Sequence, residues 1–99
     1  MKIFGFSGLA LKERMTFFVY ILQSDVDGSF YIGQTQDLIK RLEKHNKGLN
    51  RSTKLKRPWK VKFSKIYSTR SEAYKIEQYL KSLKRRASIV KWIEENNGV

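Results

Sequence analysis

The chain has 99 residues, 40% of them hydrophobic, and a formal net charge of +12 from 21 basic and 9 acidic side chains. This length allows one domain with a single modest core, and the hydrophobic content excludes a disordered tail. The absence of cysteine and the presence of only one histidine exclude disulfides, thiolate zinc sites, cysteine nucleophiles and metal cages of several histidines.

The positive charge is concentrated in one quarter of the chain. Residues 40–65 hold eleven basic side chains and a single acid, Glu43, for a local net charge of +10. Charge of this density indicates a polyanionic partner such as nucleic acid; the alternative is a solvated, solubilising face. No apolar run of about 18 residues could span a membrane, and the lack of cysteine gives no reason to expect an oxidising compartment. We therefore expect a cytoplasmic protein with no membrane partner.

Residues 1–15 differ in pattern from the rest of the chain. One lysine precedes a short apolar run that glycines interrupt, and no small-residue cleavage site follows, so the pattern is not that of a secretory signal. We expect an N-terminal appendage, either disordered or a short helix, followed by one domain over residues 16–96.

Residues 17–23 and 30–34 are rich in aromatic and β-branched side chains, and the segment between them is a turn cluster over residues 25–28 that ends in glycine. This pattern predicts a β-hairpin. Because side chains alternate along a strand, the hairpin has one face that carries both of its tyrosines and one face of ordinary core residues.

The tyrosine face of this hairpin follows from the predicted register. With a loop at 25–28, Tyr20 lies opposite Gly33, and Tyr20 and Tyr31 become diagonal neighbours. The glycine would leave room for a substrate backbone beside Tyr20. The other face holds four core residues: Val19, Ile21, Phe30 and Ile32.

A helix is expected after the hairpin. Thr35 is its predicted N-cap, and the helix runs to about Lys47 and ends at Gly48. Arg41 and His45 are four residues apart and therefore share one helix face. The predicted buried stripe consists of Leu38, Ile39 and Leu42.

Residues 49–60 read as a basic, polar loop, and residues 61–67 as a third strand. Alternation places the apolar side chains of that strand on one face: Val61, Phe63 and Tyr67. Trp59, directly after the only proline, has two interpretations: it stacks on an unpaired base, or it belongs to the core, which is the commoner case at the start of a strand.

Two helices close the chain. Thr69-Arg70-Ser71-Glu72 is a capping box, and the helix after it has an apolar stripe bordered by Glu77. The last helix covers about residues 86–96. The residues that we expect to be buried on these two helices are Ala73, Ile76, Leu80, Leu83, Ile89, Trp92 and Ile93. The predicted class is α+β, a small three-stranded antiparallel sheet flanked by helices in the order β-β-α-β-α-α.

Each candidate functional residue also has an ordinary structural explanation. Tyrosines in strands usually serve packing, and Arg41 with His45 fits a plain helix surface. Glu77 could form an i,i+4 ion pair with Lys81. The order of these residues along a compact, very basic α+β chain is more specific than any one of them.

In that order the sequence resembles the GIY-YIG nuclease superfamily, in particular its small single-domain members, which are similar to the N-terminal domain of excinuclease C. The resemblance covers about residues 16–92. The residues that carry it are Tyr31-Ile32-Gly33, Phe18-Val19-Tyr20 (with Phe18 where the family has glycine), Arg41, His45-Asn46 and Glu77.

The resemblance implies a metal-dependent endonuclease that hydrolyses phosphodiester bonds. It implies one divalent cation, Mg²⁺ or Mn²⁺, held by Glu77 and waters, with Tyr20 as general base and Arg41 on the scissile phosphate, and products with a 5′-phosphate and a 3′-hydroxyl. Gly33 and Asn46 are structural members of the motifs. Whether Tyr31 or His45 assists Tyr20 stays open, and so does a role of His45 as a donor to phosphate.

Five basic residues of the loop are predicted to hold phosphates outside the cleavage position: Arg51, Lys54, Lys56, Arg57 and Lys60. Such contacts give affinity and salt dependence without sequence readout. Since the chain carries no additional DNA-binding domain, we expect a structure-selective or weakly specific nuclease of repair or recombination, acting on DNA rather than RNA. A protein partner could supply further specificity. The alternative is a non-catalytic nucleic-acid-binding module on the same fold.

Overall fold

The computed structural model describes residues 16–97, so the expectation for residues 1–15 lies outside the described part. The elements follow the predicted β-β-α-β-α-α order of an α+β fold. In chain order they are β2 (Phe17–Ser24), β3 (Phe30–Thr35), α2 (Leu38–Asn46), the short 3-10 helix η1 (Lys54–Lys56), β4 (Trp59–Tyr67), α3 (Arg70–Ser82) and α4 (Arg86–Asn96).

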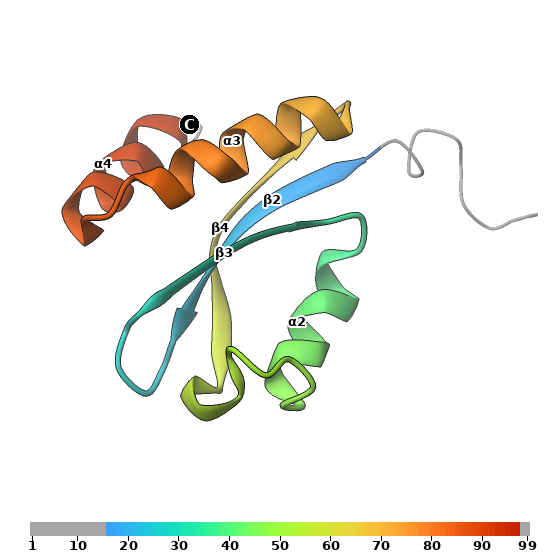
Figure 1. Ribbon diagram of the computed structural model, residues 1–99, viewed down its shortest axis with the longest axis vertical. Coiled ribbons are helices and arrows are strands. Elements are labelled where there is room, and N and C mark those ends of the chain that lie inside the picture. The colour runs from blue at the N-terminus through green and yellow to red at the C-terminus, as the bar shows by residue number, and fades with distance from the viewer. Residues whose placement is uncertain (1–15, 98–99) are drawn as a thin grey trace, which may run out of the picture.

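The three strands form one antiparallel sheet in the order β3-β2-β4, with helices on both faces (Figure 1). The hairpin has the predicted register, since Tyr20 pairs with Gly33. Ser24 closes the turn with a backbone hydrogen bond to Ser29, and Gly28 adopts a φ of 74°, a conformation that favours glycine.

Alternation along β2 divides the core between the two faces of the sheet. Val19 and Ile21 lie on the core face of the hairpin, as predicted, and this face points toward α3 and α4, where they pack in a cluster with Phe63, Ala73, Leu80, Ile89 and Ile93. Tyr20 and Leu22 point toward α2 and pack with Trp59, Tyr31, Leu38 and Leu42. The tyrosine face of the hairpin is therefore a second, smaller core, on the face of the sheet that α2 covers (Figure 1).

Strand β4 begins at Trp59, two residues earlier than predicted, and contains a bulge. Ile21 pairs with Phe63 while Leu22 pairs with Val61, so Lys62 is an extra residue between them. The bulge changes the face on which the following residues lie. Trp59 therefore belongs to the α2 core and Phe63 to the α3 core, whereas Val61 is 39% exposed. The predicted single apolar face of this strand was wrong because alternation cannot anticipate a bulge.

Helix α2 differs from its prediction at two residues. Its N-cap is Asp37, whose carboxylate accepts from the Lys40 backbone N–H, and Thr35 instead accepts from the Asp37 N–H. Ile39, predicted to be buried, is 74% exposed. The reason is that Leu38 and Leu42 face the sheet together with His45, which is completely buried and occupies the third place in the stripe.

Helices α3 and α4 follow the sequence pattern closely. Thr69 caps α3 by accepting from the Glu72 N–H, and Ala73 and Leu80 are fully buried. Helix α4 buries Ile89 and Ile93, and Trp92 stacks edge-on against Phe63. Within residues 16–97, no helix combines the length and the apolar character that crossing a membrane requires.

Candidate active site

The two hairpin tyrosines lie side by side under α2, with ring centroids 6.4 Å apart. Tyr20 comes from the central strand and is completely buried, whereas Tyr31 comes from the edge strand and is half-buried. The predicted diagonal arrangement is therefore present. The hydroxyl of Tyr20 is the deeper of the two groups.

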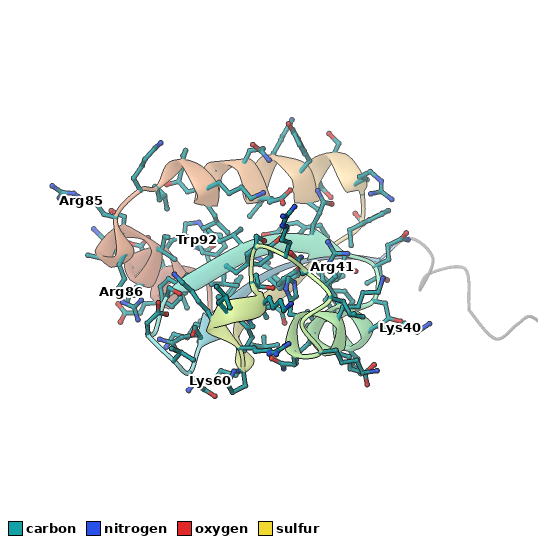
Figure 2. All side chains as sticks on the ribbon, turned by 60° about the horizontal axis from the view of Figure 1, so that its bottom comes forward. Lys40, Arg41, Lys60, Arg85, Arg86 and Trp92 are labelled. Carbon is teal, nitrogen blue, oxygen red and sulfur yellow. The ribbon has the colours of Figure 1, made fainter. Side chains whose placement is uncertain are left out.

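Helix α2 brings Arg41 and His45 to that hydroxyl. The Nε of Arg41 donates to the Tyr20 hydroxyl oxygen at 3.4 Å, and Nε2 of His45 lies 3.4 Å from the same oxygen. Figure 2 shows Arg41 pointing from α2 toward the sheet, whereas its neighbour Lys40 points away from it. Arg41 and His45 can both reach the Tyr20 hydroxyl oxygen because residues four apart on a helix lie on the same face.

These contacts set the protonation states of the site. Burial raises the pKa of the Tyr20 phenol, although its hydrogen bond and proximity to Arg41 oppose the rise. The hydrogen bond to Tyr20 in turn raises the pKa of Arg41. Burial lowers the pKa of His45, and the Arg41 charge lowers it further. At neutral pH the site therefore holds a neutral phenol, a neutral imidazole and a guanidinium cation.

Gly33 has a different role from the one predicted. A Cβ at this position would lie 2.5 Å from the Tyr20 hydroxyl oxygen, closer than any side-chain carbon tolerates. The space above Gly33 is thus occupied by Tyr20 itself and is not left for a substrate backbone. Gly33 is required because it allows the phenol to cross the edge strand.

Asn46 and Thr53 hold the end of α2 and the following loop against β4. The Asn46 side chain bonds both backbone groups of Trp59, donating to its carbonyl at 3.0 Å and accepting from its N–H at 2.6 Å. Trp59 is core, 5% exposed, and its indole N–H donates to the Thr53 carbonyl. The Thr53 hydroxyl lies 2.8 Å from Nδ1 of His45. This scaffold fixes the position of His45.

Glu77 approaches from the opposite side of the sheet. It lies on α3, only 8% exposed, and its carboxylate accepts from the Gln34 amide at 3.0 Å and pairs with Lys81 at 3.0 Å. Gln34 is the neighbour of Gly33 on β3, and the Glu77 charge contributes to raising the Tyr20 pKa. Glu77 is therefore close enough to the tyrosine site to affect it electrostatically, across the edge strand, but its bonding partners are Gln34 and Lys81 and not Arg41 or His45.

A single carboxylate can serve a magnesium ion, because Mg²⁺ keeps most of its waters and completes its shell with substrate phosphate. In residues 16–97 no cluster of three or more acidic or histidine side chains is present to hold a metal by itself. Glu77 fits this minimal kind of site. The Lys81 ammonium now neutralises the carboxylate, so a bound cation would replace it.

A hollow of about 300 Å³ lies next to Arg41, between α2 and the loop that follows it. Three of its five lining side chains are cationic, and the lining residues are Arg41, Lys44, Leu49, Asn50 and Arg51. A cationic hollow that shares an arginine with the tyrosine site is suited to the phosphate of a polyanion.

The five predicted phosphate contacts of the loop have different surroundings. Arg51 lines the hollow. Lys56 and Lys60 instead form ion pairs with Asp27 and Asp25 at the hairpin turn, each at 3.3 Å, and Lys60 lies well away from Arg41 in Figure 2. Two others lie along the loop, an exposed Lys54 and an Arg57 whose guanidinium packs over Gly48.

Sequence reasoning missed three residues of this region. Lys44 and Asn50 line the hollow, and Thr53 contacts His45. The i,i+3 spacing of Arg41 and Lys44 on α2 was a usable signal for the first. Nothing local marks Asn50 or Thr53, because both are ordinary loop residues until the loop folds back on α2.

The comparisons with known proteins agree with one another. The family described as GIY-YIG catalytic domain matches residues 16–91. UPF0213 proteins of Staphylococcus aureus strains Mu3 and bovine RF122 are each 40% identical over 73 residues, covering 73% of this chain and 88% of theirs. The solution NMR structure of a UPF0213 protein from Bacillus halodurans has 30% identity and a TM-score of 0.55, covering 85% of this chain and 88% of that one.

Proposed function

The chain belongs to the GIY-YIG catalytic domain family, and on that premise we propose that it is a metal-dependent endonuclease that hydrolyses phosphodiester bonds in DNA. The observation that carries the proposal is the meeting of Arg41 and His45 at the Tyr20 hydroxyl. A buried phenol, an imidazole and a guanidinium around one oxygen supply a proton acceptor and an anion-binding group in the same place.

In the proposed reaction a water oxygen attacks phosphorus, and the bond from phosphorus to the 3′ oxygen breaks. Arg41 binds the non-bridging oxygens, on which negative charge accumulates. The water gives a proton to the Tyr20 oxygen as that oxygen releases its own hydroxyl proton to the neighbouring neutral imidazole, and the 3′ oxygen takes a proton from solvent. Because Tyr20 is completely buried under Arg41, Arg41 has to turn toward the phosphate before the water can reach the hydroxyl.

Glu77 is the proposed ligand of the divalent cation, Mg²⁺ or Mn²⁺. When bound, the cation supplies positive charge to the leaving oxygen. The contribution of this chain is the Glu77 carboxylate, which reaches from α3 to the Gln34 amide on the edge strand β3.

The proposed path of the nucleic acid follows the hollow beside Arg41. Its cations, Arg41, Lys44 and Arg51, hold backbone phosphates and read no bases. The substrate is therefore proposed to be chosen by structure, such as a branch, flap or nick in repair or recombination, with DNA preferred over RNA and a protein partner adding specificity. The competing proposal is a nucleic-acid-binding module without catalysis.

Cleavage assays on supercoiled, branched, nicked and single-stranded substrates, with and without Mg²⁺ or Mn²⁺, decide between these two functions. We expect metal-dependent nicking that Tyr20→Phe, Arg41→Ala and Glu77→Ala each reduce at least about 100-fold, the scale of a general base or an electrostatic contact in a transition state. Glu94→Ala, an exposed acid on α4, is the matched control for Glu77.

Binding is measured on the same variants without metal. Arg41→Ala should retain most of the affinity, because it removes one of many cationic contacts. A protein that binds DNA but nicks no substrate under any metal condition would be the binding module and not the nuclease. Equal loss of binding and cleavage in Arg41→Ala would likewise reduce its role to electrostatic capture.

A further inference from the structure

The Tyr20 hydroxyl is one end of a chain of buried polar groups. Nε2 of His45 lies 3.4 Å from that hydroxyl, and Nδ1 of the same ring lies 2.8 Å from the Thr53 hydroxyl. The Thr53 hydroxyl in turn donates to the Asn50 carbonyl at 3.3 Å. His45 and Tyr20 are completely buried, and Thr53 is 1% exposed, so water cannot substitute for these partners.

The direction of the hydrogen bonds follows from counting protons. A threonine hydroxyl has a single proton. Since that proton goes to the Asn50 carbonyl, which can only accept, the Thr53 oxygen accepts from His45. The proton of the neutral imidazole therefore sits on Nδ1, and Nε2 is left as an acceptor.

The opposite orientation leaves one buried proton without an acceptor. If Thr53 donated to Nδ1, the Nε2–H would point at the Tyr20 oxygen, which already accepts from Arg41. In residues 16–97 the structure gives the Tyr20 hydroxyl two partners, Arg41 and His45, and an arginine cannot accept. A buried hydroxyl without an acceptor is destabilising, so the first orientation is the stable one.

We propose that Thr53 is a positioning residue that locks His45 in the Nδ1–H form, so that Nε2 accepts the Tyr20 proton as Tyr20 takes one from the attacking water. This proposal rests on the proposed nuclease function. A neutral phenol is a poor base at neutral pH, and the relay lets it act without ionising first: one proton enters the Tyr20 oxygen and one leaves it for Nε2. His45 becomes an imidazolium whose Nδ1–H stays bonded to Thr53.

The surroundings of His45 are compatible with this role. The titratable or charged groups that face it are Tyr20 on β2, Tyr31 on β3, with its ring centroid 4.8 Å away, and Arg41 on α2. β4 contributes only the Trp59 ring to this core. Burial and, to a smaller extent, the Arg41 charge lower the pKa of His45, which keeps Nε2 unprotonated and able to accept. When Arg41 turns to the phosphate, the smaller of these two effects is relieved.

The tautomer can be measured without substrate or metal. His45 is the single histidine of the chain, so ¹⁵N NMR of the full chain observes one imidazole. We expect a protonated Nδ1 and an unprotonated Nε2 at pH 7.5 in the wild type and in Thr53→Ser, and loss of this preference in Thr53→Val. A wild-type ring protonated on Nε2 would overturn the proposal, whether or not the valine variant folds.

Cleavage kinetics test the catalytic part. Thr53→Val should lower kcat about ten- to a hundred-fold and change KM less than about two-fold. This loss of kcat is smaller than the full contribution of a general base, because Thr53 only positions His45. Thr53→Ser, which keeps the hydroxyl, should restore kcat. Unchanged kcat in a folded Thr53→Val protein would exclude the relay. If the wild type shows the expected tautomer but cleaves no substrate, the hydrogen-bond assignment stands, and both the relay and the proposed nuclease function are wrong.

Discussion

Glu77 is the residue whose surroundings depart furthest from its proposed role. Its carboxylate oxygens already have partners, Gln34 on one and Lys81 on the other. The i,i+4 pair with Lys81 is the ordinary structural explanation that the sequence suggested, and it is present. The pair is nevertheless compatible with a metal site, because the Lys81 side chain is 49% exposed and free to withdraw, and a divalent cation replaces one positive charge by two.

A substitution of Lys81 tests this competition. Lys81→Met keeps the aliphatic stem but removes the ammonium, so the carboxylate of Glu77 no longer has an internal counter-ion. The Lys81 end of this ion pair is exposed, so the pair is worth up to about 1 kcal/mol, and we expect Mn²⁺ to bind up to about five-fold more tightly, as measured by calorimetry or EPR. Lys75→Met, an exposed lysine on the same helix, is the control. Weaker Mn²⁺ binding in Lys81→Met would show that Lys81 supports the site and does not compete with it.

The segment between α2 and β4 and the turn of the β2-β3 hairpin together decide which basic residues face a phosphate. Ser24, nearly buried, donates to the Lys56 carbonyl at 2.6 Å, which holds the loop against the acidic turn. Asp25 and Asp27 then neutralise Lys60 and Lys56. Two lysines of the loop are therefore partly neutralised next to the turn, whereas three cations line the hollow beside Arg41.

Charge removal on the two sides of this loop should have unequal effects. We expect the pair Lys44→Ala and Arg51→Ala to weaken binding to a branched DNA and to reduce the slope of log K against log salt by about 0.9 per lost contact. Lys60→Ala combined with Lys56→Ala removes the same charge from sites already paired with aspartates. Fluorescence anisotropy over a range of salt concentrations measures the affinity of both double variants for the branched DNA. Equal losses of affinity would show that the hollow beside Arg41 does not bind the DNA more strongly than the lysines next to the turn.

Over the residues that the structure describes, the sheet separates a larger hydrophobic core under α3 and α4 from a smaller core that contains the site. Besides Leu22, Leu38 and Leu42, the smaller core is made of Tyr20, Tyr31 and Trp59, with buried His45 beside it. The groups that would perform chemistry thus also support the position of α2. Folding stability and the protonation state of the site are therefore linked.

This linkage predicts a pH dependence of stability. The pKa of His45 is lower in the folded protein than in the unfolded chain, so between the two values the unfolded state binds the extra proton. The free energy of unfolding should be highest above the ordinary histidine pKa and should fall as the pH drops through that range, by at most about 1.4 kcal/mol per pH unit for one group. Urea unfolding from pH 7.5 to 5.5 measures it. In His45→Gln the free energy of unfolding should depend less on pH over this range. If the pH dependence is unchanged in this variant, it comes from the carboxylates and not from His45.

The sequence by itself determined the element order, the hairpin register and the N-cap of α3, because turn residues, alternation and capping act over a few neighbouring residues. It also placed Tyr20 with Tyr31, and Arg41 with His45, on shared faces for the same reason. It could not determine the bulge at Lys62, the exposure of Ile39 or the N-cap at Asp37, since each depends on how an element meets its neighbours.

Only the tertiary structure decided what lies around the site. The Thr53 hydroxyl on His45, the aspartates on Lys56 and Lys60, and the approach of Glu77 across β3 all join residues eight or more positions apart. Such contacts leave no local periodicity, because side-chain patterns record which face of an element is buried but not which distant group covers it. The chemistry proposed for Tyr20 depends on those distant groups, since burial and hydrogen bonding set its proton affinity.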